Sequence, residues 1–221
     1  MTQSKHVLFD LDGTLTDSSE GIINSIRFAL NKMGITETDH DKLVSFIGPS
    51  LKETFKNNYF PKEKDQELAI KHYREYFSSQ GIFENKLYIG IETLLNELKK
   101  NNYIISLATA KPTYFANIIL KHFKIDSYFT VVVGSHLTGK RTNKIDIIEE
   151  VKDQLGRPLP SNCFMIGDRE YDIKGGNHHK IPTIGVSYGF GKQQELQDAN
   201  PTYIANSVEE LTQYLCNSNR T

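Results

Sequence analysis

The stretch "DLDGTLTDS", Asp10 to Ser18, decides the fold of this chain. It follows the apolar run "HVLF", which favours a buried β-strand. Asp10 and Asp12 are two positions apart, so in an extended segment their side chains project to the same side. Gly13 permits a sharp turn directly after them. Turn chemistry alone would also account for these residue types, whereas a calcium loop is disfavoured because its later ligand positions are unmet.

Four further runs rich in β-branched and aromatic residues follow along the chain. They are "YIISLAT", "YFTVVVG", "CFMIGD" and "TIGVSYG", at residues 103–109, 128–134, 163–168 and 183–189. Helical patterns lie between them, at residues 113–123, 144–155 and 171–177. This alternation predicts an α/β fold with a doubly wound parallel sheet, in which ligands bind at the carboxyl ends of the strands.

Residues 16–86 break this alternation because they contain no convincing strand. We expect a helix after Asp17 and Glu20, which have the spacing of a capping box. Apolar residues then recur at the helical period, and Gly34 is placed to end the helix. The segment is therefore predicted to be a helical insertion.

A second acidic pair, Asp168 and Asp172, lies in "IGDREYD" at the end of another predicted strand. In a doubly wound sheet this strand end would lie near the first, which would bring four carboxylates into one crevice. Two unit charges about 4 Å apart repel by about 4 kcal/mol at an effective dielectric constant near 20, so the cluster needs a bound cation or raised pKa values. Because all the ligand atoms would be oxygen, we predict Mg²⁺.

Thr109 ends the predicted strand at 103–109, shortly before a helix that starts behind Pro112. Its hydroxyl, together with free backbone N–H groups in "LATAKP", would suit an anionic oxygen. Thr109 could equally cap a helix or be a buried strand hydroxyl.

The stretch "VVVGSHLTGKRTNK", residues 131–144, nearly has the spacing of a nucleotide-binding phosphate loop. Such a loop needs Ser or Thr after Gly139 and Lys140 to ligate Mg²⁺, but Arg141 stands there and cannot do so. The nucleotide-loop interpretation is therefore disfavoured. Lys140 and Arg141 are predicted to be solvated loop charges, with contact to a substrate as the alternative for either.

Lys144 is the cation in this stretch that we expect to bind an anion. If Asn143 caps the next helix and pairs with Asp146, Lys144 lies in the first turn. There the helix dipole disfavours a cation by about 0.3–1 kcal/mol. A lysine in that position indicates that another anion is close by.

Charge and hydropathy exclude several classes of protein. The chain has 221 residues, of which 38% are hydrophobic, and 26 basic against 27 acidic residues give a net charge of -1. Such a balance provides no field to attract polymeric nucleic acid or an anionic membrane. The sequence has no signal-like segment and no run of bilayer length, so a cytoplasmic location is expected. His178 and His179 are predicted to be loop or surface residues.

Taken together and in order, "DLDGTLTDS", Thr109, Lys144 and "GDREYD" resemble the four motifs of the haloacid dehalogenase superfamily. The match spans nearly the whole chain and is specific to the phosphoglycolate phosphatase-like and 5'-nucleotidase-like branch, which has a helical C1-type cap. The resemblance implies a Rossmann-like core domain at residues 1–15 and 87–221 and a cap domain at residues 16–86. "FIGPSL", residues 46–51, resembles the substrate-facing loop of that cap.

The resemblance also implies roles for the strand-end residues. Asp10 would be the nucleophile that forms an aspartyl-phosphate, and Asp12 the general acid and base. Magnesium would bind Asp10, the main-chain carbonyl of Asp12 and Asp168, with Asp172 nearby. The residues that would contact substrate are Thr109, Ala110 and Lys144 in the core, and Ser50 and Lys52 in the cap.

The predicted function is that of a Mg²⁺-dependent phosphatase for a small soluble phosphomonoester, acting as a monomer or homodimer. Two residues depart from the phosphoglycolate phosphatase pattern: Arg169 in the fourth motif, and Thr138 where related sequences often have Asp. The substrate therefore stays open between phosphoglycolate, a 5'-nucleotide and phosphotyrosine. A pyrophosphatase or phosphosugar mutase on the same scaffold is an alternative. A signalling receiver domain is a further alternative, which the position of the acidic pair and the helical insertion disfavour.

Overall fold

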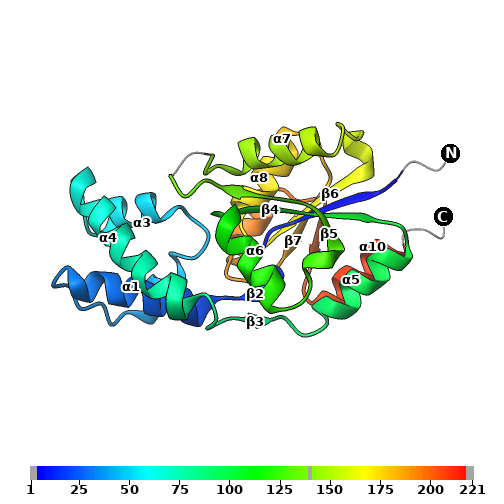
Figure 1. The fold of residues 1–221 in the computed structure, drawn as a ribbon. Coiled ribbons are helices and arrows are strands. Elements are labelled where there is room, and N and C mark those ends of the chain that lie inside the picture. The colour runs from blue at the N-terminus through cyan, green and yellow to red at the C-terminus, as the bar shows by residue number, and fades with distance from the viewer. Residues whose placement is uncertain (1–3, 139–140, 218–221) are drawn as a thin grey trace. The chain divides into compact units, whose positions relative to one another are not determined.

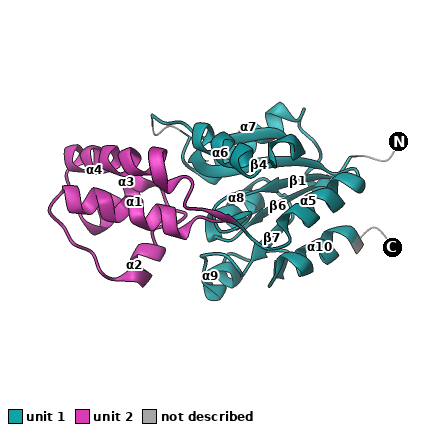
Figure 2. Cartoon of the chain, turned by 60° about the horizontal axis from the view of Figure 1, so that its bottom comes forward, with its two compact units in different colours: residues 1–16, 87–221 teal, residues 17–86 magenta. Residues whose placement is uncertain are grey.

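The computed structural model describes residues 4–138 and 141–217, which form two compact units (Figure 2). Unit 1 comprises Met1–Thr16 with Leu87–Thr221, and unit 2 comprises Asp17–Lys86. The chain leaves unit 1 through the short strand β2 (Thr16–Asp17) and returns through β3 (Lys86–Leu87). These two strands pair with each other in a separate two-stranded sheet.

Unit 1 is built on a six-stranded sheet with the order β5-β4-β1-β6-β7-β8 (Figure 1). Neighbouring strands are parallel throughout. The strands are β1 (His6–Phe9), β4 (Ile104–Pro112), β5 (Phe129–Ser135), β6 (Cys163–Gly167), β7 (Thr183–Val186) and β8 (Tyr203–Ala205). Because β4 and β5 extend to one side of β1 and β6 to β8 to the other, the strand order reverses at β1. The predicted doubly wound α/β fold is confirmed, and the sequence interpretation missed only the three-residue edge strand β8 among these strands.

Helices cover both faces of this sheet, as Figure 1 shows with α7 and α8 on one side and α5 and α10 on the other. The helices of unit 1 are α5 (Ile91–Lys100), α6 (Thr113–His122), α7 (Lys144–Gln154), α8 (Glu170–His178), α9 (Gln193–Asp198) and α10 (Val208–Asn217). α7 packs on β4 and β5, and its apolar residues Ile147, Ile148 and Val151 belong to one buried cluster with Leu8 of β1 and Met165 of β6. This packing fixes where α7 begins relative to β1. Within residues 4–138 and 141–217, none of the helices combines the length and apolar character of a membrane span.

Unit 2 consists of helices α1 (Ser19–Lys32), α2 (His40–Val44), α3 (Leu51–Asn58) and α4 (Glu63–Tyr76), followed by a π-helical turn at Phe77–Gly81. Gly34 follows α1 with φ +77°, as predicted for the end of that helix. The predicted capping box is wrong, because the N-cap of α1 is Ser18, which makes no side-chain capping bond among the described residues. Asp17 instead accepts hydrogen bonds from the N–H and hydroxyl of Ser19, at 3.1 and 2.6 Å.

Candidate active site

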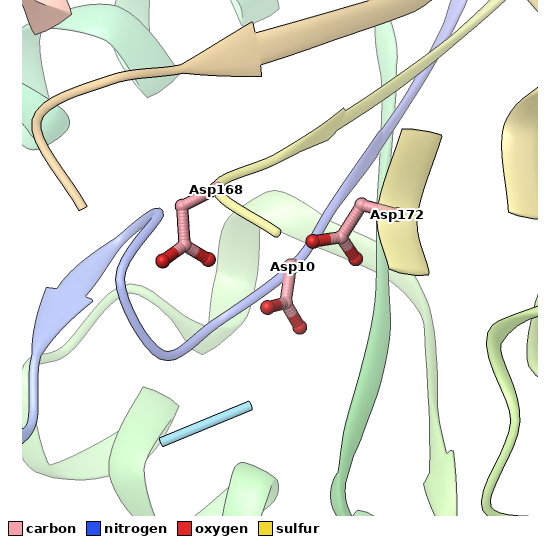
Figure 3. Close-up of side chains that lie close together, drawn as sticks. All are labelled: Asp10, Asp168 and Asp172. Carbon is pink, nitrogen blue, oxygen red and sulfur yellow. The ribbon is translucent and has the colours of Figure 1, made fainter. Parts of the chain in front are cut away.

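Three aspartates meet at the carboxyl ends of β1 and β6 (Figure 3). Asp10 directly follows β1, and its N–H donates to the carbonyl of Ile166 in β6 at 2.9 Å. Asp168 directly follows β6, and Asp172 lies in the first turn of α8. One carboxylate oxygen from each of the three lies within 4.8 Å of the others, and all three residues are buried. The expected convergence of the two acidic pairs therefore holds for these three side chains.

Lys144 supplies the positive charge at this cluster. Its Nζ lies 2.7 Å from Asp10 Oδ1, 2.6 Å from Asp172 Oδ1 and 2.7 Å from the carbonyl oxygen of Ala108. Asn143 caps α7 as predicted, accepting from the N–H of Asp146 at 2.8 Å. Lys144 thus begins the helix with its side chain directed into the buried cluster, and only 6% of the residue is exposed.

The protonation of this cluster follows from its burial. Burial acts to lower the pKa of Lys144, but the charges of Asp10 and Asp172 outweigh it and raise that pKa above its usual value. Burial, with a contribution from the charge of Asp10, raises the pKa of Asp168 well above the ordinary range of an aspartate. Burial also raises the pKa of Asp172 to about 6, although Lys144 opposes this effect. One lysine therefore does not offset three buried carboxylates.

The donor set at Asp168 fits a magnesium ion. Asp168 is fully buried, and its Oδ2 accepts from the N–H of Phe190 at 2.7 Å. Its Oδ1 is buried without a hydrogen-bond partner among the described residues, which is costly for a carboxylate unless a cation or a proton is bound. Gly13, with φ +84°, allows the β1 turn to approach closely, because a Cβ there would lie 2.2 Å from Asp168 Oδ2. Carboxylate oxygens of this kind are the ligands that Mg²⁺ prefers.

Asp12 does not belong to the group of three aspartates and has a separate partner, a lysine that sequence reasoning missed. Lys111 Nζ lies 3.0 Å from Asp12 Oδ2, and the side chains are 6% and 13% exposed. Lys111 was visible in "LATAKP", two residues after Thr109, but a lysine near the end of a strand gives no sequence signal of burial. The Asp12 carboxylate therefore has a counter-charge of its own, apart from Lys144.

Thr109 lies in β4, directly after the alanine whose carbonyl binds Lys144. It is buried, and its hydroxyl accepts from the N–H of Lys111 at 3.2 Å. We expected free N–H groups in this stretch, but this one is bonded. The N-cap of α6 is Pro112, which leaves Thr109 as a strand hydroxyl and not a helix cap. Ala110 is partly exposed beside it.

The stretch at residues 131–144 is not arranged as a nucleotide loop where it is described. Gly134 belongs to β5, and its N–H donates to the hydroxyl of Thr113 at 2.8 Å. Its carbonyl accepts from Nε and Nη2 of Arg141, at 3.1 and 3.0 Å. The prediction of a merely solvated Arg141 is wrong, because this side chain ties the end of β5 to Glu150 of α7. Gly139 and Lys140 lie outside the described residues.

The remaining candidates have local partners. In unit 2, Ser50 caps α3 by accepting from the N–H of Glu53, and Lys52 forms an ion pair with Glu63 at 2.5 Å. Their contact with substrate stays a prediction. In unit 1, His178 is exposed as expected, but the side chain of His179 is only 8% exposed and lies 2.9 Å from the carbonyl of Ile145.

Comparison with known proteins identifies the family. The model of the family described as haloacid dehalogenase-like hydrolase matches residues 7–186. The chain belongs to this family. The prediction of a phosphatase-type hydrolase is thereby confirmed at the level of the family. The aspartates at the strand ends belong to the motifs that carry the resemblance to this family.

Several relatives of this haloacid dehalogenase-like hydrolase match along almost all of its length. A 5'-nucleotidase from Pseudomonas aeruginosa is 41% identical over 95% of both chains. The tyrosine-protein kinase PtkA from Mycobacterium tuberculosis is 36% identical over 95% of this chain and 72% of its own. A pyrophosphatase, PpaX, from Bacillus cereus is 31% identical over 97% of both. A crystal structure of a predicted phosphatase from Clostridium acetobutylicum has a TM-score of 0.93 and 46% identity, covering 98% of this chain and all of the other.

Proposed function

We propose that this protein is a Mg²⁺-dependent phosphatase that hydrolyses a small soluble phosphomonoester, of the phosphoglycolate or 5'-nucleotide type, through an aspartyl-phosphate at Asp10. The observation that carries the proposal is the buried pairing of Asp10 with Lys144, next to a carboxylate oxygen of Asp168 that has no hydrogen-bond partner in the part of the chain that the structure describes. A nucleophilic carboxylate needs a fixed position and nearby positive charge to receive a phosphoryl group. Both conditions are met at this strand end.

The chemistry would run in two displacements. First, a carboxylate oxygen of Asp10 attacks phosphorus, the bond from phosphorus to the leaving oxygen breaks, and Asp12 gives its proton to that oxygen. Second, Asp12 takes a proton from water, and the hydroxide oxygen that results attacks phosphorus. The bond between phosphorus and the Asp10 oxygen then breaks, which releases inorganic phosphate. Lys144 and the hydroxyl of Thr109 would bind phosphoryl oxygens while negative charge shifts from the attacking oxygen to the leaving oxygen.

Magnesium would be held by Asp10, Asp168 and the main-chain carbonyl of Asp12, with Asp172 close by. When bound, it would neutralise negative charge on the phosphoryl oxygens and on the carboxylates that face them. Asp172 would serve mainly to orient Lys144, which it contacts at 2.6 Å. This division of roles between metal binding, proton transfer and orientation of Lys144 explains how four acidic residues can act on one anionic substrate.

Unit 2 would act as a cap that contributes Ser50 and Lys52 to substrate recognition. Caps of this kind exclude bulk water from the reacting groups. The likeness to a 5'-nucleotidase supports a nucleotide-type substrate, and the likeness to a pyrophosphatase supports pyrophosphate as a second candidate. The charge balance supports a small phosphorylated metabolite over a polymer, and whether the protein is a monomer or a homodimer stays a prediction.

The test is Mg²⁺-dependent release of phosphate from a panel of phosphoglycolate, 5'-mononucleotides, phosphosugars, phosphotyrosine and pyrophosphate, with the Asp10→Asn variant as control. We expect one phosphomonoester to be far ahead in kcat/KM. If pyrophosphate instead has the highest kcat/KM, with two phosphates released per turnover, the result would favour the second candidate. An isomeric phosphosugar as product, without free phosphate, would indicate a mutase, and a long-lived phosphoprotein without turnover would contradict the phosphatase proposal.

A further inference from the structure

A segment after β7 wraps around Asp168, and we name Tyr188–Glu195 the strap. Its Phe190 N–H donates to Asp168 Oδ2 at 2.7 Å. At its beginning, the hydroxyl of Tyr188 donates to the carbonyl of Thr14 at 3.0 Å. The strap therefore bonds both to the carboxylate that follows β6 and to the turn that follows β1.

Two glycines let the strap lie against the backbone of Asp168. A Cβ at Gly189 would lie 2.4 Å from the Cβ of Asp168 and 2.2 Å from the carbonyl oxygen of Gly13. A Cβ at Gly191 would lie 1.8 Å from the carbonyl oxygen of Asp168. No larger residue fits at either position without moving the aspartate. The contact is thus built into the sequence "YGFG" of the strap.

Glu195, the last residue of the strap, bonds it to the residues that follow Asp168. A single oxygen, Oε1, accepts both from Arg169 Nε at 2.7 Å and from the N–H of Glu170 at 3.0 Å. Both donors lie in the turn between Asp168 and Asp172, and the N–H of Arg169 in turn donates to Asp172 Oδ2 at 3.1 Å. The pair of Arg169 and Glu195 is mostly buried, with side chains 13% and 19% exposed.

We propose that Glu195 is a positioning residue for the metal site, which holds the turn of residues 168–172 so that the Asp168 carboxylate keeps its place opposite Asp10. The proposal rests on the proposed function in that it requires the aspartates to bind a divalent cation. We assign Glu195 a positioning role and not that of a ligand, because its Oε1 accepts from both Arg169 and Glu170. Partners of this kind, one step removed from the ligands, typically change metal affinity by about 10–100-fold when they are lost.

The experiment is calorimetric titration of Mn²⁺, as a probe of the divalent site, into the metal-free full-length protein and three variants. Glu195→Ala removes the acceptor, and we expect Mn²⁺ to bind at least about tenfold more weakly. Glu195→Gln keeps an amide oxygen that can accept from both donors, so we expect it to retain most of the affinity. Asp198→Asn removes a negative charge from the same helix, where Asp198 accepts from Gln194, and should bind like the wild type. Circular dichroism would verify that each variant is folded.

The outcomes separate this proposal from the proposed function. A wild-type protein that binds no Mn²⁺ would overturn the metal-dependent function and the role of Glu195 with it. Wild-type affinity in a folded Glu195→Ala variant would overturn the positioning role alone. An equal loss in Glu195→Ala, Glu195→Gln and Asp198→Asn would also overturn it, because general charge would then be the cause. If Glu195→Ala does not fold, Arg169→Gln removes the guanidinium and keeps the backbone donor, and the same weakening is expected there.

Discussion

Lys144 Nζ lies 2.7 Å from Asp10 Oδ1 although the two residues are 134 positions apart in the chain. The contact is made because α7, which begins with Lys144, packs its apolar face into the same buried cluster as Leu8 of β1. The lysine occupies a helix position where its charge is unfavourable to the helix dipole. The two carboxylates that it contacts, those of Asp10 and Asp172, offset this cost.

Replacing Lys144 by Met should therefore reduce stability as well as activity. The variant keeps an unbranched side chain one atom shorter but leaves Asp10 and Asp172 buried without their counter-charge. Removing one partner of a buried ion pair typically costs about 3–5 kcal/mol. We expect a fall of this order in the free energy of unfolding in urea, measured without metal near neutral pH, together with loss of turnover.

Lys100→Met is the matched control for that variant. Lys100 pairs with Glu97 at 2.8 Å on an exposed face of α5. Pairs of this kind contribute little because water and salt screen them. Equal unfolding curves for the two lysine variants would contradict the assignment of Lys144 as the counter-charge of the cluster.

Asp10→Asn should abolish turnover without unfolding the protein. The amide has the same shape but is not a nucleophile, so the rate should fall by about three orders of magnitude or more. The variant should also fail to acquire radioactive phosphate from a labelled substrate in a rapid-quench experiment. Asp126→Asn, on the exposed turn Asp126–Tyr128, should keep full activity. Retained turnover in Asp10→Asn would exclude Asp10 as the nucleophile.

The acidic pairs and the alternating strands made the sheet and most of the cluster predictable from the sequence. Asp10, Asp168 and Lys144 each stand where a strand or helix pattern changes, and the order of strands in a doubly wound sheet brings such positions together. The edge strand β8 was missed because three residues carry almost no periodic signal. The boundary at α1 was wrong because Asp17 forms a turn with Ser19 where a capping box was expected.

The partners that hold the cluster in place were not predictable, for a different physical reason. The N–H of Phe190 contacts Asp168 through the backbone, which every residue type except proline offers equally. The ion pair of Lys111 with Asp12 depends on the register between β4 and β1, which a single sequence does not specify. Glu195 lies in a short helix whose pattern looks like an ordinary solvated surface.

Lys111 and Asp12 should act as one unit in catalysis. Their contact fixes the direction of the Asp12 carboxylate, which we propose to be the proton donor and acceptor. Asp12→Asn should lower kcat by about 10²–10⁴-fold, and Lys111→Met should lower it as well. In the double variant we expect the losses to be less than additive, with a coupling energy of about 0.5–3 kcal/mol in kcat/KM. Strict additivity in this double-mutant cycle would show that the ion pair has no part in the reaction.

Magnesium should stabilise the protein more at about pH 7.5 than at about pH 5. Burial raises the pKa of Asp168 well above its usual range and that of Asp172 to about 6. In the unfolded chain both groups titrate near the ordinary value of about 3.9. Between these values the metal-free folded state binds more protons than the unfolded state, so the free energy of unfolding falls as the pH rises.

Magnesium reverses this trend because it competes with protons for the same oxygens. The measurement is the melting temperature in EDTA and in excess Mg²⁺ at the two pH values, and we expect the metal-induced increase to be larger at the higher pH. In Asp168→Asn the buried oxygen that requires a cation is replaced by an uncharged amide, so most of the increase and its pH dependence should be lost. A larger increase at the lower pH in the wild type would mean that Mg²⁺ does not bind at these aspartates.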